Sequence, residues 1–471
     1  MSQKTDGIYD AKKLGTSKML VLGFQHKLAM FGATVLVPLL TGLNIATTLL
    51  MAGLGTLLFH LITKGKVPAF LGSSFAFLGG YAAVAPLSGT EAMTNAELLP
   101  YASLGVACAG LVYLVLAALI KWAGVKKVMK FFPPVVTGPI IIAIGLGLSG
   151  SAVSNCQQNW LIAFIALAIV VIFNIWGKGM AKIIPILLGV LGSCLIAAIL
   201  ALVFGKTIEI DGAAYIALNG NPNMVLFSKG ALDTFISAPW IGLPIKWTGT
   251  VFGGIDWTQG SLIISSIIAI TPIALATMME HIGDVSAISS TVGKNFIAEP
   301  GLHRTLMGDG LATTLSALFG GPANTTYGEN TGVLALSKVY DPKVIRIAAV
   351  VAIILSFSPK FEALIALIPT AVIGGISFIL YGMISAIGVR NVVENNVDFT
   401  KSRNLIVAAI ILVSALGLGS LTFAIGSITI SLSALATASI AGIVLNAILP
   451  GKDYDFKETP EGADTGVNFE I

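Results

Sequence analysis

Four acidic residues, Glu280, Asp284, Asp309 and Glu329, lie within or next to long apolar stretches of the sequence. A carboxylate at the centre of a transmembrane helix costs about 2.5–3.5 kcal/mol on insertion scales, so acids at such positions are functional candidates by default. Buried carboxylates with acidic neighbours can take up a proton at physiological pH. These residue types therefore predict hydrogen bonding to a ligand together with reversible protonation.

Two further polar residues belong to the same set. His26 lies in the first apolar stretch, and Asn330 ends the polar run "GPANTTYGEN" (321–330). Glu280 and Asp284 are four residues apart, so they share one face of a helix. We expect one site built from side chains that are distant in the sequence.

Three of these residues also have a structural interpretation that the sequence leaves open. His26 fits a hydrogen-bonded core histidine, and Asp309, which is flanked by glycines, fits a buried structural acid. Asp284 fits a water-exposed position at the cytoplasmic end of its helix.

The elements that position these residues are transmembrane segments. The chain of 471 residues is 55% hydrophobic and 11% charged, with a mean hydropathy of +0.91, whereas soluble domains carry about 25% charged residues. This composition predicts an all-α polytopic membrane protein, in which about 20 apolar residues form each crossing. Fourteen transmembrane segments are predicted, near 18–40, 44–63, 67–87, 102–123, 133–149, 160–176, 183–205, 261–283, 302–319, 322–340, 344–358, 369–389, 404–420 and 428–449.

The distribution of lysine and arginine supports this count. With both termini cytoplasmic, only four of the 27 Lys and Arg residues fall on the opposite side: Lys206, Lys229, Lys246 and Lys360. Seven spans on each side of the polar stretch 206–260 give the two halves opposite orientations, which is the geometry of inverted-repeat transporters.

The third span of each half is interrupted in the same way. "VPAFLGSSFAFLGG" (67–80) and "GGPANTTYGENTGV" (320–333) contain proline, glycines and hydroxyl residues where a continuous apolar helix is expected. Non-helical backbone at this depth survives only where protein encloses it or where it lines a cavity. We therefore expect short extended pieces leading into half-helices in spans 3 and 10, with free N–H groups near the membrane centre.

Carboxylates without an accompanying arginine disfavour an anionic ligand. A planar nucleobase offers N–H donors to carboxylates and C=O acceptors to backbone amides, and Phe75 provides an aromatic wall. Proton symport is the expected energy source, and sodium coupling stays open.

No metal site, cofactor, catalytic triad or nucleic-acid footprint is predicted, so an enzyme is a remote alternative. An anion exchanger or channel with the same layout is a second remote alternative.

At these residues the chain resembles the nucleobase-ascorbate transporter (nucleobase:cation symporter-2) family, most closely its bacterial uracil permeases. The similarity covers about residues 18–450 and includes the signature Glu329, Asn330, Thr331 and Gly332, followed by Ser337 and Lys338. It is strongest at "GFQHKLAMFGATVLVPLL" (23–40), "GKVPAFLGSSFAF" (65–77), "PGLHRTLMGDGL" (300–311) and "NTTYGENTGV" (324–333).

The resemblance implies a core domain and a gate domain that move against each other in the plasma membrane. Members of the family often dimerise through the gate domain. Each domain takes one segment from each half of the chain. The implied organisation is a cytoplasmic tail (1–17), the N-terminal core segment (18–123), the N-terminal gate segment (133–205), an extracellular loop (206–260), the C-terminal core segment (261–358), the C-terminal gate segment (369–449) and a second cytoplasmic tail (450–471).

The resemblance also implies roles for individual residues. Substrate binding falls to Glu280, Glu329, His26 and Asn330 and to the backbone amides of Phe75 and Gly328, and proton coupling to Glu280, Asp284 and Asp309. Glu329 is typical of uracil carriers, whereas Asp284 and Asp309 match purine carriers better. Uracil:proton symport is the expected function, with symport of xanthine or another purine as the alternative.

Overall fold

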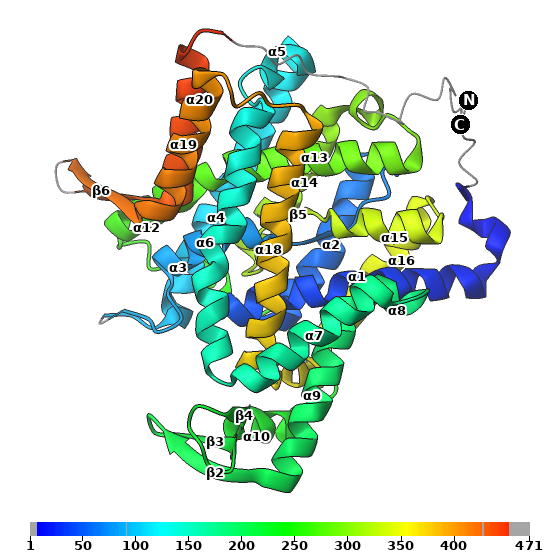
Figure 1. The fold of residues 1–471 in the computed structure, drawn as a ribbon, viewed down its shortest axis with the longest axis vertical. Helices are drawn as coiled ribbons and strands as arrows, with labels where there is room; N and C mark the ends of the chain where they lie inside the picture. The colour runs from blue at the N-terminus through cyan, green and yellow to red at the C-terminus, as the bar shows by residue number, and fades with distance from the viewer. Residues whose placement is uncertain (1–6, 91, 426–427, 452–471) are drawn as a thin grey trace.

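The computed structural model describes residues 7–90, 92–425 and 428–451. The chain is mainly helical (Figure 1), and its described residues also form three small β-sheets. The helices of the first repeat and its linker are α1 (Thr16–Thr41), α2 (Ile45–Ile62), α3 (Leu78–Val84), α4 (Asn95–Ala123), α5 (Val125–Met129), α6 (Pro134–Gln157), α7 (Trp160–Trp176), α8 (Met180–Ile183), α9 (Pro185–Phe204), α10 (Lys229–Ser237) and α11 (Val251–Gly254). Those of the second repeat are α12 (Gly260–Ile270), α13 (Ala274–Val292), α14 (Leu302–Leu318), α15 (Glu329–Ser337), α16 (Pro342–Ser356), α17 (Pro359–Ala366), α18 (Thr370–Glu394), α19 (Ser402–Gly417) and α20 (Ala434–Ile448).

Every one of the fourteen predicted ranges contains a helix of the structure. Within the described residues, seven helical stretches are long and apolar enough to cross a bilayer, counting α12 and α13 as one, and α16 with α17 forms an eighth that bends by 91°. The other ranges contain shorter apolar helices, the more polar helix α14 or the two interrupted segments. The prediction of a polytopic helical membrane protein is confirmed.

The local sequence sets the ends of these helices. Gly42 ends α1 in the left-handed conformation, and Asn44 then caps α2 by accepting a hydrogen bond from the Thr47 amide. Gly293 ends α13 in the same left-handed conformation. Such tight caps satisfy the last backbone groups of each helix, which is required where water is scarce.

The helices pack in two groups. One consists of α6, α7, α9, α18, α19 and α20, in which α6 and α18 lie side by side (Figure 1). The other consists of α1, α2, α4, α12, α14 and α16, in which α2 and α4 both pack on α14. We call them the α6–α18 group and the α2–α14 group.

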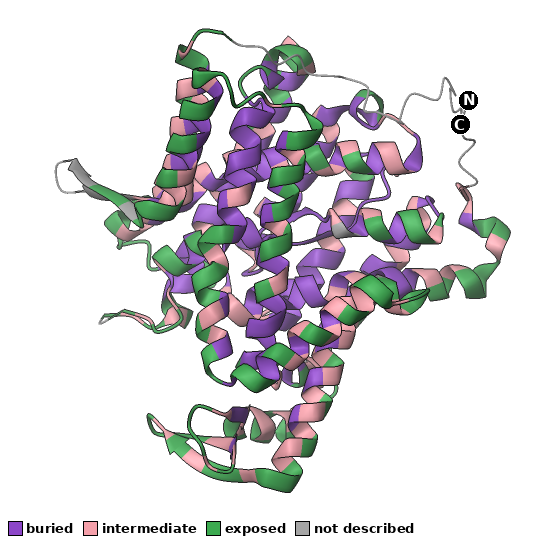
Figure 2. Ribbon diagram, viewed as in Figure 1, coloured by how far each residue is buried: buried purple, intermediate pink, exposed green. Residues whose placement is uncertain are grey.

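Buried residues gather in the interior of the molecule and exposed residues lie along its outer helices (Figure 2). Many of the exposed residues are large and apolar. Leu202 in α9 and Trp122 in α4 are 87% and 86% exposed. Soluble monomers rarely present large contiguous apolar patches, and these helices have the length that a bilayer requires. Exposed apolar faces of this kind are typical of a multi-pass membrane protein.

Three β-structures complete the fold. Strands β1 (Leu71–Ser73) and β5 (Asn324–Thr326) form an antiparallel pair, which confirms the extended pieces predicted in spans 3 and 10. Strands β2 (Gly205–Ile210), β3 (Ala213–Leu218) and β4 (Val225–Ser228) form a sheet that projects with α10 beyond α9, at the lower end of Figure 1. Strands β6 (Ser420–Ile425) and β7 (Ile428–Ser433) form a hairpin.

The hairpin differs from the expectation of one apolar segment over 428–449. Residues 428–433, "ITISLS", alternate between β-branched or apolar residues and hydroxyl residues, and this period of two favours a strand over a helix. The segment therefore divides into β7 and α20.

Candidate substrate site at the paired broken segments

The two broken segments meet as a short buried ladder. Leu71, Gly72 and Ser73 pair with Thr326, Thr325 and Asn324 respectively. The ladder is extended by the Ser74 amide, which donates to the Ala323 carbonyl at 2.9 Å, and by the Tyr327 amide, which donates to the Phe70 carbonyl at 3.0 Å. Each strand therefore satisfies the backbone of the other where the membrane offers no water.

A helical piece follows each strand. After β1, Phe75 begins a short 3-10 helix (Phe75–Phe77) that continues into α3, and after β5, Gly328 precedes the first residue of α15. The backbone N–H groups at such helix starts lack intrahelical acceptors and carry the positive end of the helix dipole. The predicted ligand-facing amides of Phe75 and Gly328 both lie at these starts.

Asp309 of α14 holds β5 in place. Its Oδ2 accepts a hydrogen bond from the Thr326 amide at 3.0 Å, and its Oδ1 accepts one from the Thr326 hydroxyl at 2.9 Å. His281 Nδ1 lies 2.8 Å from Asp309 Oδ2, and both side chains are fully buried. These contacts give Asp309 a positioning role, and its involvement in proton coupling stays a prediction.

His26 and Asn330 form a second buried contact. Asn330 Nδ2 donates to the Pro68 carbonyl at 2.7 Å, which leaves Asn330 Oδ1 as the acceptor for His26 Nδ1–H at 3.0 Å. This assignment leaves a lone pair on His26 Nε2, an atom with no hydrogen-bond partner among the described residues. Asn330 thus joins α1, the approach to β1 and the start of α15.

Asp284 lies beside the start of α15. A Cβ atom built on Gly328 would meet Asp284 Oδ1 at 2.6 Å, closer than real Cβ atoms approach. Only glycine fits at 328 while the carboxylate keeps this place. The structure therefore brings Asp284 to the backbone that was predicted to receive the ligand.

Glu280 and Asp284 share the face of α13 that borders open space. Gly283 lies between them and is exposed. A Cβ atom built on it would have no neighbouring atom within 4 Å. Both acidic residues are partly buried. The side chain of Glu329 lies outside the described portion of the chain, although its backbone begins α15.

The ring of Phe75 contacts the other helix group. It packs edge-to-face on Tyr381 of α18, with ring centroids 6.1 Å apart and an interplanar angle of 72°. Phe75 is 8% exposed. The predicted aromatic wall therefore lies where the broken segment meets the α6–α18 group.

The structure also adds two residues that the sequence analysis left out of the site. His281 follows Glu280 directly, so its place beside an intramembrane acid was the signal that could have identified it. Ser74, the residue after β1, is 3% exposed, and its hydroxyl has no hydrogen-bond partner among the described residues. A buried hydroxyl next to the Phe75 amide is a candidate ligand contact, because unpaired buried polar atoms are rare in native structures.

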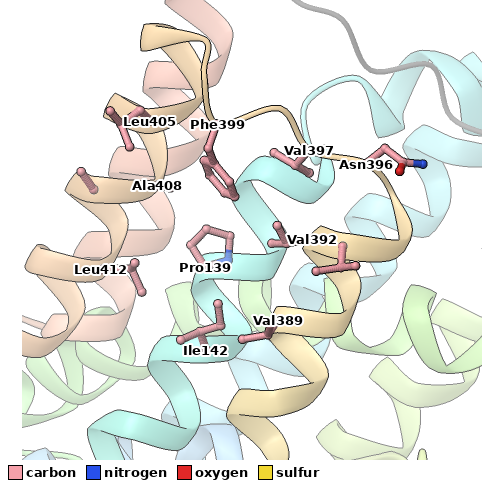
Figure 3. A pocket seen from close by; sticks show the side chains of 12 residues that line it. Pro139, Ile142, Val389, Val392, Asn396, Val397, Phe399, Leu405, Ala408 and Leu412 are labelled. Carbon is pink, nitrogen blue, oxygen red and sulfur yellow. The ribbon is translucent and has the colours of Figure 1, made fainter.

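An open groove of about 630 Å³ lies elsewhere, between α6, α18 and α19 (Figure 3). Its walls are almost entirely apolar, as Ile142, Val389, Phe399 and Leu412 illustrate. A nucleobase needs several polar partners, so this groove does not fit one.

Comparison with known proteins agrees with this architecture. A family model described as a permease family (Xan_ur_permease) matches residues 17–426. The chain belongs to this family. It is 39% identical over 461 residues to the uracil permease of Bacillus caldolyticus, with 96% of each chain covered.

Two further uracil permeases show the same full-length similarity. The protein of Bacillus subtilis (strain 168) is 38% identical, with 93% of this chain and 94% of the relative covered. The protein of Escherichia coli (strain K12) is 35% identical, with 95% and 94% covered. This permease is therefore similar to these relatives through both repeats.

Solved transporters share the fold. The transmembrane domain of the cyanobacterial bicarbonate transporter BicA aligns with a TM-score of 0.61 at 16% identity, covering 93% of this chain and 99% of that one. SLC26A9 aligns with a TM-score of 0.60 at 11% identity, covering 93% and 66%. At these identities the likeness concerns the fold alone.

A glycine series tests whether the open space beside α13 receives the ligand. We expect Gly283→Ala to retain uptake and Gly283→Phe to lower it by at least about tenfold, because ligand pockets enclose most of the ligand surface and the added ring would compete for that volume. Uptake of radiolabelled uracil by cells with matched levels of each variant measures these effects. Gly260→Phe, at another glycine with open space around it, is the control; equal uptake by both phenylalanine variants would place the ligand elsewhere.

Proposed function

We propose that this chain is a uracil:proton symporter of the plasma membrane that works by alternating access. The α2–α14 group with the broken segments is the core domain (18–123 and 261–358), and the α6–α18 group is the gate domain (133–205 and 369–449). Both termini are cytoplasmic, and residues 206–260 are extracellular. The carrier releases its cargo chemically unchanged.

One observation carries this proposal. The paired strands β1 and β5 bring two helix starts together next to an acidic face of α13, with Asp284 beside Gly328. Uracil offers two N–H donors and two carbonyl acceptors on one planar ring. Carboxylates accept from the N–H groups, and backbone amides at the helix starts donate to the carbonyls.

The protein residues divide this task. Glu280 and Glu329 bind the N–H edge, and the amides of Phe75 and Gly328 meet the carbonyls. His26 and Asn330 fix the start of α15. An acidic site of this kind disfavours anions, which distinguishes the chain from the bicarbonate carrier of similar fold.

Proton coupling follows from the same acids. When uracil enters the site beside the acidic face of α13, the carboxylates there lose water and come close to one another. Both changes favour uptake of a proton. Glu280 and Asp284 on α13 are the proposed proton carriers, with Asp309 as their fixed neighbour. The proton then stays on these acids until the site opens to the cytoplasm and uracil leaves.

Uptake into proteoliposomes tests substrate and coupling together. We expect labelled uracil to accumulate faster as the outer buffer is made more acidic than the lumen, and a protonophore to abolish accumulation in sodium-free buffer. Uracil uptake that is unaffected by the protonophore, or that requires sodium, would contradict proton symport.

Competition distinguishes the purine alternative, which the identities of Asp284 and Asp309 favour. Excess unlabelled uracil should displace the label, and xanthine should not. Displacement by xanthine but not by uracil would make the chain a purine carrier.

A further inference from the structure

Lys360 lies at the first turn of α17 and caps the end of α10. Its Nζ donates to the Phe235 carbonyl at 2.6 Å and to the Ile236 carbonyl at 3.0 Å. These are carbonyls of the last turn of α10, where unpaired carbonyls and the helix dipole attract a cation. The ammonium also lies 4.7 Å from the centroid of the Phe235 ring and 5.9 Å from that of Trp240.

The two segments that Lys360 joins are both connections between the helix groups. Residues 205–259 connect α9 of the α6–α18 group to α12 of the α2–α14 group. Residues 357–369, which include α17, connect α16 to α18 in the opposite direction, and α17 is bent by 91° from α16. Backbone bonds also join them: the Lys360 amide donates to the Pro239 carbonyl, and the Gly242 amide to the Phe357 carbonyl, each at 2.9 Å.

The beginning of the longer connection is fixed to the α6–α18 group. The Val225 amide of β4 donates to the Gln158 carbonyl at 3.1 Å, and Asn159 Nδ2 donates to the Val225 carbonyl at 3.2 Å. Gln158 and Asn159 form the turn between α6 and α7. The sheet therefore stays with this group.

The far end of the same connection is fixed to the α2–α14 group. Thr47 of α2 donates its hydroxyl to the Pro244 carbonyl at 2.5 Å, and the Asp256 amide donates to the Tyr101 hydroxyl of α4 at 3.1 Å. If the two groups move relative to each other, the stretch between Val225 and Pro244, which contains α10, must therefore change its conformation.

We propose that Lys360 couples the two extracellular connections into a single hinge, so that α10 and α17 move together when the core and gate domains exchange the side to which the site opens. This inference rests on the proposed alternating-access function. Lys360 is a positioning residue, since it lies outside the substrate site and acts on the domain movement. It also gives residues 206–260 a role as the mechanical link across the outer face.

The test compares Lys360→Met, which keeps much of the stem and removes the ammonium, with Lys360→Arg, which retains a cationic donor. Lys229→Met, at an exposed lysine in the first turn of α10, is the matched control. We expect Lys360→Met to lower the maximal rate of uracil uptake by about threefold or more, because reorientation of domains sets the turnover of such carriers. Uracil affinity of the purified protein should change less than about twofold, since the site is not touched. Lys360→Arg should restore the rate.

Amide hydrogen exchange of the full-length protein provides a readout that does not depend on the substrate. In Lys360→Met, exchange should accelerate in both 232–242 and 357–363, and in Lys229→Met it should remain at the wild-type rate. Unchanged exchange in either segment would overturn the proposed coupling of α10 and α17 by Lys360, whatever the protein transports. Faster exchange with an unaltered uptake rate, or a parallel loss of uracil binding, would overturn its role in the domain movement. Absence of uracil uptake by the wild-type protein would refute only the proposed function.

Discussion

Replacing Glu280 by glutamine is expected to abolish proton-driven accumulation of uracil. Glutamine has nearly the same size as glutamate but cannot carry the proton. Its amide offers one neutral acceptor oxygen, whereas the carboxylate offers two charged oxygens that accept charge-assisted hydrogen bonds. Hydrogen bonds to charged groups contribute about 1.5–3 kcal/mol each, so uracil affinity should fall by roughly 10- to 150-fold. Titration calorimetry of the purified protein measures the affinity, and proteoliposome uptake under a pH gradient measures the accumulation.

Glu394→Gln is the control for this substitution. Glu394 is an exposed residue paired with Arg390 at the end of α18, and exposed pairs contribute about 0–1 kcal/mol. It should behave as the wild type in both measurements. Wild-type uptake and affinity in Glu280→Gln would remove Glu280 from the site.

Replacing Asp309 by alanine is expected to loosen β5 and to lower the stability of the whole protein. The change leaves the Thr326 amide and hydroxyl without their acceptors and leaves His281 without its fully buried partner. Leaving a buried hydrogen-bonding group without its partner costs about 1–3 kcal/mol. The melting temperature of the purified protein should drop by several degrees, and uptake should be lost.

Asp309→Asn separates the structural contribution from the charge. Asparagine keeps one oxygen that can accept from Thr326, so its melting temperature should lie between those of the wild type and Asp309→Ala. Uptake lost at a wild-type melting temperature in Asp309→Asn would assign Asp309 to proton coupling rather than to support of β5. A wild-type melting temperature in Asp309→Ala would contradict the anchoring of β5.

The interrupted spans could be predicted because membrane depth makes non-helical backbone conspicuous. Proline, glycine and hydroxyl residues inside 67–80 and 320–333 break an apolar pattern that is otherwise continuous. The same contrast identified the acids on α13 and α14, since a carboxylate in an apolar span is costly. The family resemblance then added the backbone positions at Phe75 and Gly328.

The contacts that assemble the site could not be predicted in this way. The register that pairs Gly72 with Thr325 depends on two segments about 250 residues apart, and no local pattern specifies it. The bond between His26 and Asn330 is equally distant in sequence. The oxygens of Asp309 face Thr326, a geometry that only the packing of α14 against β5 determines. Its part in proton coupling stays a prediction.

The polar connection between the repeats shows a second limit of the sequence. Its composition predicted an excursion from the membrane but neither the three-stranded sheet nor the contact between Lys360 and α10. Strand pairing and a lysine that reaches carbonyls about 125 residues away are tertiary events. Charge counting predicted Lys360 to be one of the few basic residues opposite the cytoplasmic side, and this placement stays a prediction.

Uracil-dependent protection from amide hydrogen exchange tests most directly where the ligand binds. Saturating uracil should slow exchange in 74–79, 279–285 and 327–331, the segments that bring two helix starts to the acidic face of α13. Exchange in 389–399, beside the apolar groove between α18 and α19, should not change. Protection confined to that groove, or no protection at the paired segments, would contradict a nucleobase site between the two broken spans.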